Sequence, residues 1–149
     1  MSEHKIDLDW KGAPPSSDQT TYNRNHTVSF SDTVQVTVSS APEYKGDPNC
    51  ADPEKLLTSA LASCHMLTFL AIADLKGFKV ESYKDQATGF LEKGESGRPH
   101  ITRIELRPSI VFAGEEKPDE AAIKRMHASA HKNCFIANSI KAKVDVLDT

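Results

Sequence analysis

Two cysteines and one arginine are the residues of this sequence best suited to redox chemistry. Cys64 lies in a long apolar stretch, Cys134 follows about 70 residues later, and Arg24 stands alone in a polar run. A thiol attacks only as the thiolate, and a fixed cation beside it lowers its pKa from about 8.5. Peroxide converts a thiolate to a sulfenic acid, which a second thiol captures as a disulfide. The three residues together favour thiol-based redox chemistry.

A structural role is the simpler interpretation of each of these residues taken alone. Free cysteine is often buried as a small hydrophobic side chain, which would suffice for Cys64. Glu54 suits the positive end of a helix without any catalytic task. Cys50, four residues before Glu54, reads as an incidental loop cysteine that could also trap an oxidised Cys64.

Two further functions stay open from the residues. His127, His131 and Cys134 fall on one helical face, and Cys64 or His65 could complete a tetrahedral metal site. No paired histidine or cysteine ligand set accompanies them on a second element, which weakens this alternative. The other possibility is a thiol sensor whose Cys64 oxidises without turning over.

The helix that would carry Cys64 is predicted over Pro53–Lys76. Asp52 can cap its first amides, Pro53 fits the first helical position and Gly77 supplies the stop. Apolar residues surround most of its circumference, so it must be covered on nearly every side. The sequence offers one other long helix, and we therefore expect a second copy of the chain to supply the missing cover.

Period-2 alternation predicts three N-terminal strands, around Ile6–Trp10, Val28–Phe30 and Val34–Val38, that form a meander. Gly12–Asp18 is a loop by composition. Alternation returns later in the chain, followed by a second helix and a last strand. The predicted segments are a hairpin of Val80–Leu91 with Thr102–Phe112, a helix from the cap Asp119 to about Lys132, and a strand over Ala142–Leu147. The predicted fold class is α+β, with strands grouped around two central helices.

Composition limits the partners and the location. A chain of 149 residues allows one domain, 1–149, and a net charge of −3 provides no basic field for nucleic acid. Three cysteines are too few for a disulfide framework, and the N-terminus lacks a secretory signal. Leu56–Ala73 carries no formal charge, but the polar residues inside it favour a buried helix over a membrane span. We expect a cytoplasmic protein.

Two segments resemble a known family. Asp52-Pro-Glu-Lys-Leu-Leu-Thr-Ser-Ala-Leu-Ala-Ser-Cys-His65 and Ala130-His-Lys-Asn-Cys134 are similar to the OsmC/Ohr family of osmotically inducible and organic hydroperoxide resistance proteins. The resemblance covers nearly the whole chain. It implies an OsmC-like fold with antiparallel sheets wrapped around two central helices, in an intertwined homodimer with active sites at the subunit interface.

The resemblance also implies a function and roles. The activity would be a thiol-dependent peroxidase that reduces organic hydroperoxides and is recycled by a dithiol, more plausibly of lipoyl type than thioredoxin, with no cofactor. Cys64 matches the peroxidatic cysteine, Cys134 the resolving cysteine, Glu54 the motif glutamate and Arg24 the activating arginine. Phe135 stands where a common family pattern has proline.

Helix geometry constrains Glu54. It precedes Cys64 by ten residues, which places the two roughly 15 Å apart along one helix and about 80° apart around it. They cannot touch within one straight helix. If Glu54 orients Arg24 against Cys64, the site must combine residues of two chains.

Overall fold

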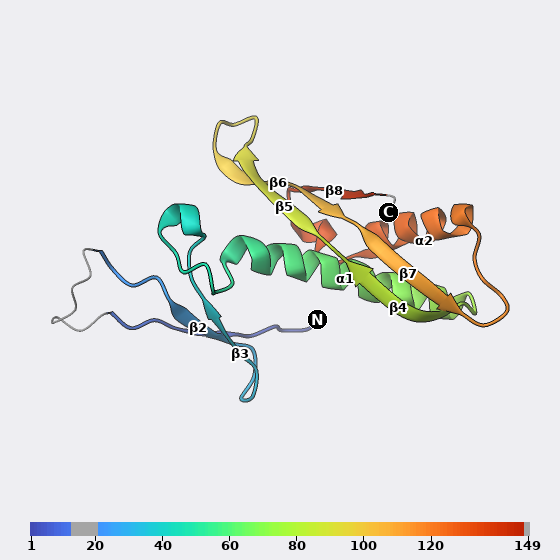
Figure 1. Ribbon diagram of the computed structural model, residues 1–149, viewed down its shortest axis with the longest axis horizontal. Coiled ribbons are helices and arrows are strands. Elements are labelled where there is room, and N and C mark those ends of the chain that lie inside the picture. Colours follow the sequence, from blue (N-terminus) through green and yellow to red (C-terminus); the bar gives the residue numbers. More distant parts are fainter. Residues whose placement is uncertain (13–20, 148–149) are drawn as a thin grey trace. The chain divides into compact units, whose positions relative to one another are not determined.

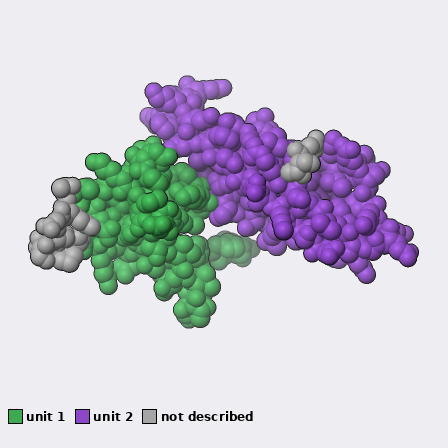
Figure 2. Space-filling model, viewed as in Figure 1, with its two compact units in different colours: residues 1–56 green, residues 57–149 purple. Residues whose placement is uncertain are grey.

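The computed structural model describes residues 1–12 and 21–147, so the loop predicted over 12–18 lies outside the described residues apart from Gly12 (Figure 1). Contacts between Cα atoms divide the chain into two compact units, residues 1–56 and 57–149 (Figure 2). The prediction of a single domain over 1–149 stays a prediction.

The first unit is built on an antiparallel meander, as its alternating pattern predicts. Its strands are β1 (Asp7–Asp9), β2 (His26–Ser29) and β3 (Gln35–Val38), in the order β1-β2-β3. Leu8 pairs with Val28, and Val28 with Val36, so these side chains share one face of the sheet. Several large apolar side chains of this unit remain exposed: Ile6, Leu8, Trp10, Phe30 and Val34.

The chain then turns toward the long helix. A short 3₁₀ helix, η1 (Pro42–Tyr44), follows β3, and an isolated parallel bridge joins Val38 to Ala51. The helix α1 covers Pro53–Leu75, one residue shorter than predicted. Its start is capped by Asp52, whose Oδ1 accepts from the Lys55 N–H at 2.8 Å.

Gly77 ends α1 in the way the sequence predicts. Its φ of +78° is a left-handed conformation that glycine adopts without a steric penalty. The N–H groups of Gly77 and Phe78 then donate to the carbonyls of Asp74 and Ala73, at 2.9 and 3.0 Å. These bonds satisfy carbonyl groups that the end of a helix would otherwise leave without donors.

The second unit holds two further sheets. Sequence alternation predicts one hairpin of two long strands, but the structure breaks each of them into two. The outer pieces, β4 and β7, pair in one sheet. The inner pieces, β5 and β6, pair in the other sheet, where β6 also pairs with β8. The strands are β4 (Lys79–Asp85), β5 (Thr88–Lys93), β6 (Pro99–Leu106), β7 (Pro108–Ala113) and β8 (Lys143–Val146).

The predicted hairpin is confirmed, with a short break in each of its two strands. β5 and β6 form its antiparallel part next to the Gly94–Arg98 turn, and β4 and β7 continue it beyond the break in the same register, since Thr88 pairs with Glu105 and Asp85 with Pro108. Asp85 Oδ1 accepts from the Arg107 N–H at 2.7 Å, which takes that donor out of any strand ladder at the break. Pro108, which has no N–H to give to a strand ladder, begins β7 in a two-stranded sheet.

The second helix, α2, covers Glu120–Asn133 and confirms the predicted boundaries within a residue. Asp119 is its N-cap, with Oδ1 accepting from the Ala122 N–H at 2.7 Å. Cys134 is its C-cap. A 3₁₀ turn, η2 (Ala137–Ser139), leads on to β8, which runs parallel to β6 inside the predicted last strand.

Two apolar clusters form the core of the second unit. A buried stripe on α1 supplies both, since residues four apart lie on one side of a helix. The first cluster contains Leu61, Ile101, Ile104, Leu106 and Cys134. The second contains Phe69, Ala73, Phe112, Met126 and Ala130.

The rest of α1 is poorly covered. By length and composition this helix could cross a membrane, yet only 22% of its apolar window is buried within the chain. Leu67 is 61% exposed and Leu75 is 87% exposed. The predicted need for cover on nearly every side is therefore not met by one chain.

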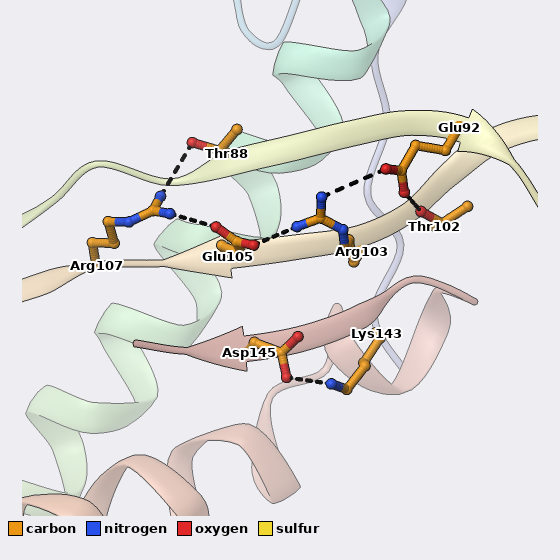
Figure 3. A network of polar contacts seen from close by, with 8 residues as sticks. All are labelled: Thr88, Glu92, Thr102, Arg103, Glu105, Arg107, Lys143 and Asp145. Carbon is orange, nitrogen blue, oxygen red and sulfur yellow. Dashed lines mark hydrogen bonds and ion pairs between the residues drawn. The ribbon is translucent and has the colours of Figure 1, made fainter. Parts of the chain in front are cut away.

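A charged network covers the outer face of the β5–β6–β8 sheet (Figure 3). Glu105 pairs with both Arg103 and Arg107, and Arg103 lies 3.4 Å over the ring of Phe90. Alternate residues of β6, such as Ile104, point to the opposite face and enter the core. Exposed ion pairs add little stability. The charged network nevertheless makes one face of the sheet polar, so that only the opposite face packs in the core.

Candidate redox site

The two cysteines singled out by the sequence lie side by side. Cys64 is in the middle of α1 and half-buried, while Cys134 caps α2 and is fully buried. Both belong to the first apolar cluster, and their thiol groups are hydrogen-bonded to each other. Cys50 belongs to the other unit, and all three cysteines are free thiols.

Hydrogen bonding prepares Cys64 to ionise. Burial alone raises its pKa, but hydrogen bonds to the sulfur outweigh that effect, so the pKa lies below its ordinary value. The donors, in order of effect, are the Cys134 thiol, the backbone N–H groups of Ile136 and Phe135, and the Thr68 hydroxyl. Each of them stabilises a thiolate more than a thiol.

Cys134 is shifted in the opposite direction. Burial raises its pKa, and the hydrogen bond and charge of Cys64 raise it further, against weaker contributions from backbone N–H groups. One of these groups, the Ala137 N–H, donates to the Cys134 sulfur at 3.4 Å. The pair is therefore asymmetric: the pKa of Cys64 is lowered and that of Cys134 is raised, so Cys64 loses its proton before Cys134 does, which is the order a nucleophilic sulfur and its resolving partner require.

Sequence reasoning missed the groups that lower the pKa of Cys64 inside this unit. Thr68 lies one turn beyond Cys64, and its hydroxyl reaches both the Cys64 carbonyl oxygen, at 2.8 Å, and the sulfur. The i, i+4 spacing was the available signal for Thr68. The amides of Phe135 and Ile136 gave no such signal, because their direction depends on how the chain turns after α2.

Arg24 and Glu54 both lie in the unit of residues 1–56. The Arg24 guanidinium lies 4.1 Å over the Tyr22 ring and donates to the Tyr22 carbonyl oxygen at 2.9 Å. Glu54 is half-buried in the first turn of α1, ten residues before Cys64. Their predicted action on the Cys64 sulfur stays a prediction.

The predicted metal-binding face is divided between two contacts. His127 is buried and lies 3.0 Å from His65 across the two helices, Cys134 faces Cys64, and His131 is exposed. Within residues 1–12 and 21–147, no three side chains of the histidine, cysteine, aspartate or glutamate type come together as a ligand set. The alternative built on His127, His131 and Cys134 is not assembled in this part of the chain.

A groove of about 1080 Å³ lies next to the first apolar cluster, which contains Cys134. Leu57, Ile101 and Ile140 line it, and all three also pack in the first apolar cluster. Arg98, His100 and Lys141 stand among its other lining residues. The groove therefore joins an apolar floor to a polar rim, whereas Leu61 and Phe69 of α1 are fully buried core residues.

Comparisons with known proteins agree with this architecture. A family model described as OsmC-like protein matches residues 46–147. An OsmC-like protein of unknown function from Vibrio cholerae O1 biovar eltor str. N16961 is 39% identical, with a TM-score of 0.93 and full coverage of both chains. The uncharacterized protein YmaD of Bacillus subtilis (strain 168) is 25% identical over 126 residues, 83% of each chain.

A more distant structure shares the fold alone. The organic hydroperoxide resistance protein OhrB of Bacillus subtilis is 16% identical, with a TM-score of 0.64, over 97% of this chain and 96% of that one. The family model covers more than half of the present chain and spans α1, α2 and both cysteines of the pair. The chain therefore belongs to the family of OsmC-like proteins.

Proposed function

We propose that this protein is a cysteine-based peroxidase that reduces organic hydroperoxides to alcohols. The observation that carries the proposal is the Cys64–Cys134 thiol pair, in which hydrogen bonds lower the pKa of Cys64 and burial raises the pKa of Cys134. Family membership supports it, since a structure of the same fold is named an organic hydroperoxide resistance protein. Leu57, Ile101 and Ile140, which line a groove and also pack in the apolar cluster that contains Cys134, offer a contact surface to the alkyl or aryl part of a substrate.

The proposed cycle has three steps. The Cys64 thiolate attacks the distal oxygen of the hydroperoxide; the O–O bond breaks, the sulfur becomes a sulfenic acid, and the alkoxide takes a proton to leave as an alcohol. The Cys134 thiol then attacks the sulfenic sulfur, forming the disulfide and releasing water. An external dithiol of lipoyl type exchanges with this disulfide, which restores both thiols and leaves the dithiol oxidised.

The cycle assigns roles to the first unit as well. We propose that Arg24 stabilises the Cys64 thiolate and that Glu54 orients the guanidinium, because a planar cation can contact a sulfur and a carboxylate together. Glu54 lies too far from Cys64 along α1 for both to act within one helix. The working unit in this proposal is a homodimer in the reducing cytoplasm, with no cofactor.

A turnover assay tests the proposal. Cumene hydroperoxide and dihydrolipoamide are supplied, and consumption of both is followed for wild type, Cys64→Ser, Cys134→Ser and Cys50→Ser. We expect Cys64→Ser to be inactive, Cys134→Ser to stop after one equivalent per chain, and Cys50→Ser, the matched control, to turn over as wild type does. Full activity of Cys64→Ser would rule out the peroxidase.

The thiol sensor gives a different result in the same assay. A sensor consumes one equivalent of hydroperoxide per chain and does not cycle when dihydrolipoamide is present. Mapping the disulfide after mild peroxide treatment identifies the resolving residue, since a Cys50–Cys64 bond would replace Cys134 in that role. We expect the Cys64–Cys134 bond, because these sulfurs already lie in contact.

A further inference from the structure

A buried pair of histidines lies beside the thiol pair and has no role in the proposed cycle. His65 directly follows Cys64 on α1 and is fully buried, and His127 of α2 is 9% exposed. His65 Nε2 lies 3.0 Å from His127 Nδ1. Phe69, one turn beyond His65, packs against the His127 ring with 4.4 Å between the ring centroids.

The geometry of the two rings shows a linear hydrogen bond. Their planes differ by 8°, and the centroid separation of 5.3 Å exceeds the nitrogen–nitrogen distance of 3.0 Å by 2.3 Å. That excess is one ring radius at each end, so the bond lies on the line joining the ring centres and the rings meet edge to edge. An N–H···N bond of this alignment is strongly directional.

The proton of this bond belongs on His65. Its other nitrogen, Nδ1, is buried and has no hydrogen-bond partner among the described residues. A proton on Nδ1 would leave a buried N–H without an acceptor, whereas a proton on Nε2 leaves only a lone pair there. His65 Nε2–H therefore donates to His127 Nδ1, and burial, then His127 and His131, keep the pKa of His65 low, at about 4.

The imidazole pair and the thiol pair form two points of attachment between the same helices. On α1 the attached residues, Cys64 and His65, are consecutive. On α2 they are His127 and Cys134, seven residues apart, which is about 10 Å along the axis and nearly the same face. Apolar packing in the second cluster also joins the two helices, and the two directional contacts at this spacing constrain both the rotation of α2 and its angle to α1.

We propose that the His65–His127 hydrogen bond is a positioning device for the redox pair, which holds α2 at the angle that keeps the Cys134 thiol against Cys64. This inference deepens the proposed peroxidase function, but it concerns the two thiols and does not require hydroperoxide turnover. The amides of Phe135 and Ile136 follow α2 directly, so the same alignment sets their contact with the Cys64 sulfur.

Amide side chains can test this geometry atom by atom. At position 127, Asn places an acceptor near the position of Nδ1, whereas Gln places it one carbon further out. At position 65 the order reverses, because Gln reaches the position of Nε2 and Asn is too short. A role limited to burial or volume would not reverse the order of the two amides between the two positions.

Two readouts follow the thiols without peroxide: the rate of Cys64 alkylation by iodoacetamide at pH 7, and the Cys64–Cys134 disulfide equilibrium in dithiothreitol buffers. We expect His127→Gln and His65→Asn to slow alkylation about tenfold and to weaken the disulfide about tenfold. His127→Asn and His65→Gln should stay within about twofold of wild type. His131→Asn, at an exposed histidine one turn along α2, is the matched control and should resemble wild type.

Circular dichroism establishes which variants are folded. If the variants at one position do not fold, the variants at the other position still test the proposal. Wild-type thiol reactivity in folded His127→Gln or His65→Asn would overturn the proposal. The same amide performing better at both positions would also overturn it. A protein that lacks peroxidase turnover but shows the reversed order would retain the positioning role and lose only the proposed function.

Discussion

At the scale of single residues, the charge on Cys64 depends on short-range hydrogen bonds as well as on any cation. A cysteine in the middle of a helix lies beyond the reach of the N-terminal helix dipole, which acts mainly on the first turn. The structure supplies donors from three other places: the Cys134 thiol, two amides after α2, and Thr68 on the next turn of α1. In the proposed site, Arg24 would add to an environment that already favours the Cys64 thiolate.

Replacing Thr68 tests this directly. Thr68→Val keeps the branched shape but removes the hydroxyl, so the pKa of Cys64 should rise and its alkylation at pH 7 should slow about fivefold, the value of one hydrogen bond of about 1 kcal/mol. Thr68→Ser keeps the hydroxyl and is the control. Iodoacetamide trapping resolved by mass spectrometry at Cys64 measures both, and equal rates for the two variants would contradict the assignment.

At the scale of elements, the helices and the long hairpin were predictable, whereas the breaks within the hairpin were not. Asp52, Gly77 and Asp119 define helix ends through local chemistry, and each acts where the sequence places it. The breaks after Asp85 and at Arg107 were not visible, because the apolar alternation runs through both without interruption. They depend on the Asp85–Arg107 contact, which joins positions 22 residues apart.

The candidate site divides in the same way. Residue types and family motif were enough to choose Cys64 and Cys134, and the structure places their sulfurs together. The sequence showed His127 on one face with His131 and Cys134, but helical periodicity cannot tell which partner on α1 each residue meets. Only packing shows that His127 meets His65 and that Cys134 meets Cys64.

The contact between α1 and α2 should make stability depend on pH. Burial, with His127 and His131 nearby, lowers the pKa of His65 from 6.5 to about 4. The Tyr83 ring contacts Phe69, which in turn packs against the His127 ring. Between pH 6.5 and about 4, His65 binds a proton in the unfolded chain but stays neutral in the folded chain. The free energy of unfolding should therefore fall as pH drops from about 6.5 to about 4, by at most about 3 kcal/mol.

Urea unfolding of the wild type between pH 7 and 4 measures this dependence. His65→Gln is the control, because it preserves the hydrogen bond to His127 without a titrating group, so its stability should fall less over the same interval. Parallel curves for the two proteins would show that His65 does not titrate on unfolding.

At the scale of the whole molecule, apolar surface remains that a single chain does not bury. Leu67 and Leu75 of α1 are exposed, and so are Leu8 and Trp10 in the first unit. Exposed apolar patches of this kind mark interaction surfaces in soluble proteins. In the homodimer proposed above, a two-fold interface would cover such surfaces on both copies at once.

A shared active site in such a dimer makes a prediction that no single variant can test. Glu54→Gln and Cys64→Ser should each be nearly inactive alone. In a mixed dimer, the Cys64 of one chain meets the intact Glu54 of the other, so one of the two sites is complete. Purification through a different tag on each chain leaves only mixed dimers, so activity should recover to about half of wild type.

The matched control for this experiment uses the two cysteines. Cys64 and Cys134 lie in contact within one chain, so mixing Cys64→Ser with Cys134→Ser gives no dimer with a complete thiol pair and should restore no turnover. Both mixtures are co-expressed with different tags, purified through each tag in turn and assayed with cumene hydroperoxide and dihydrolipoamide. If the Glu54→Gln and Cys64→Ser mixture is as inactive as this control, Glu54 does not act across the interface, and the two-chain site is wrong even if the protein is a dimer and a peroxidase.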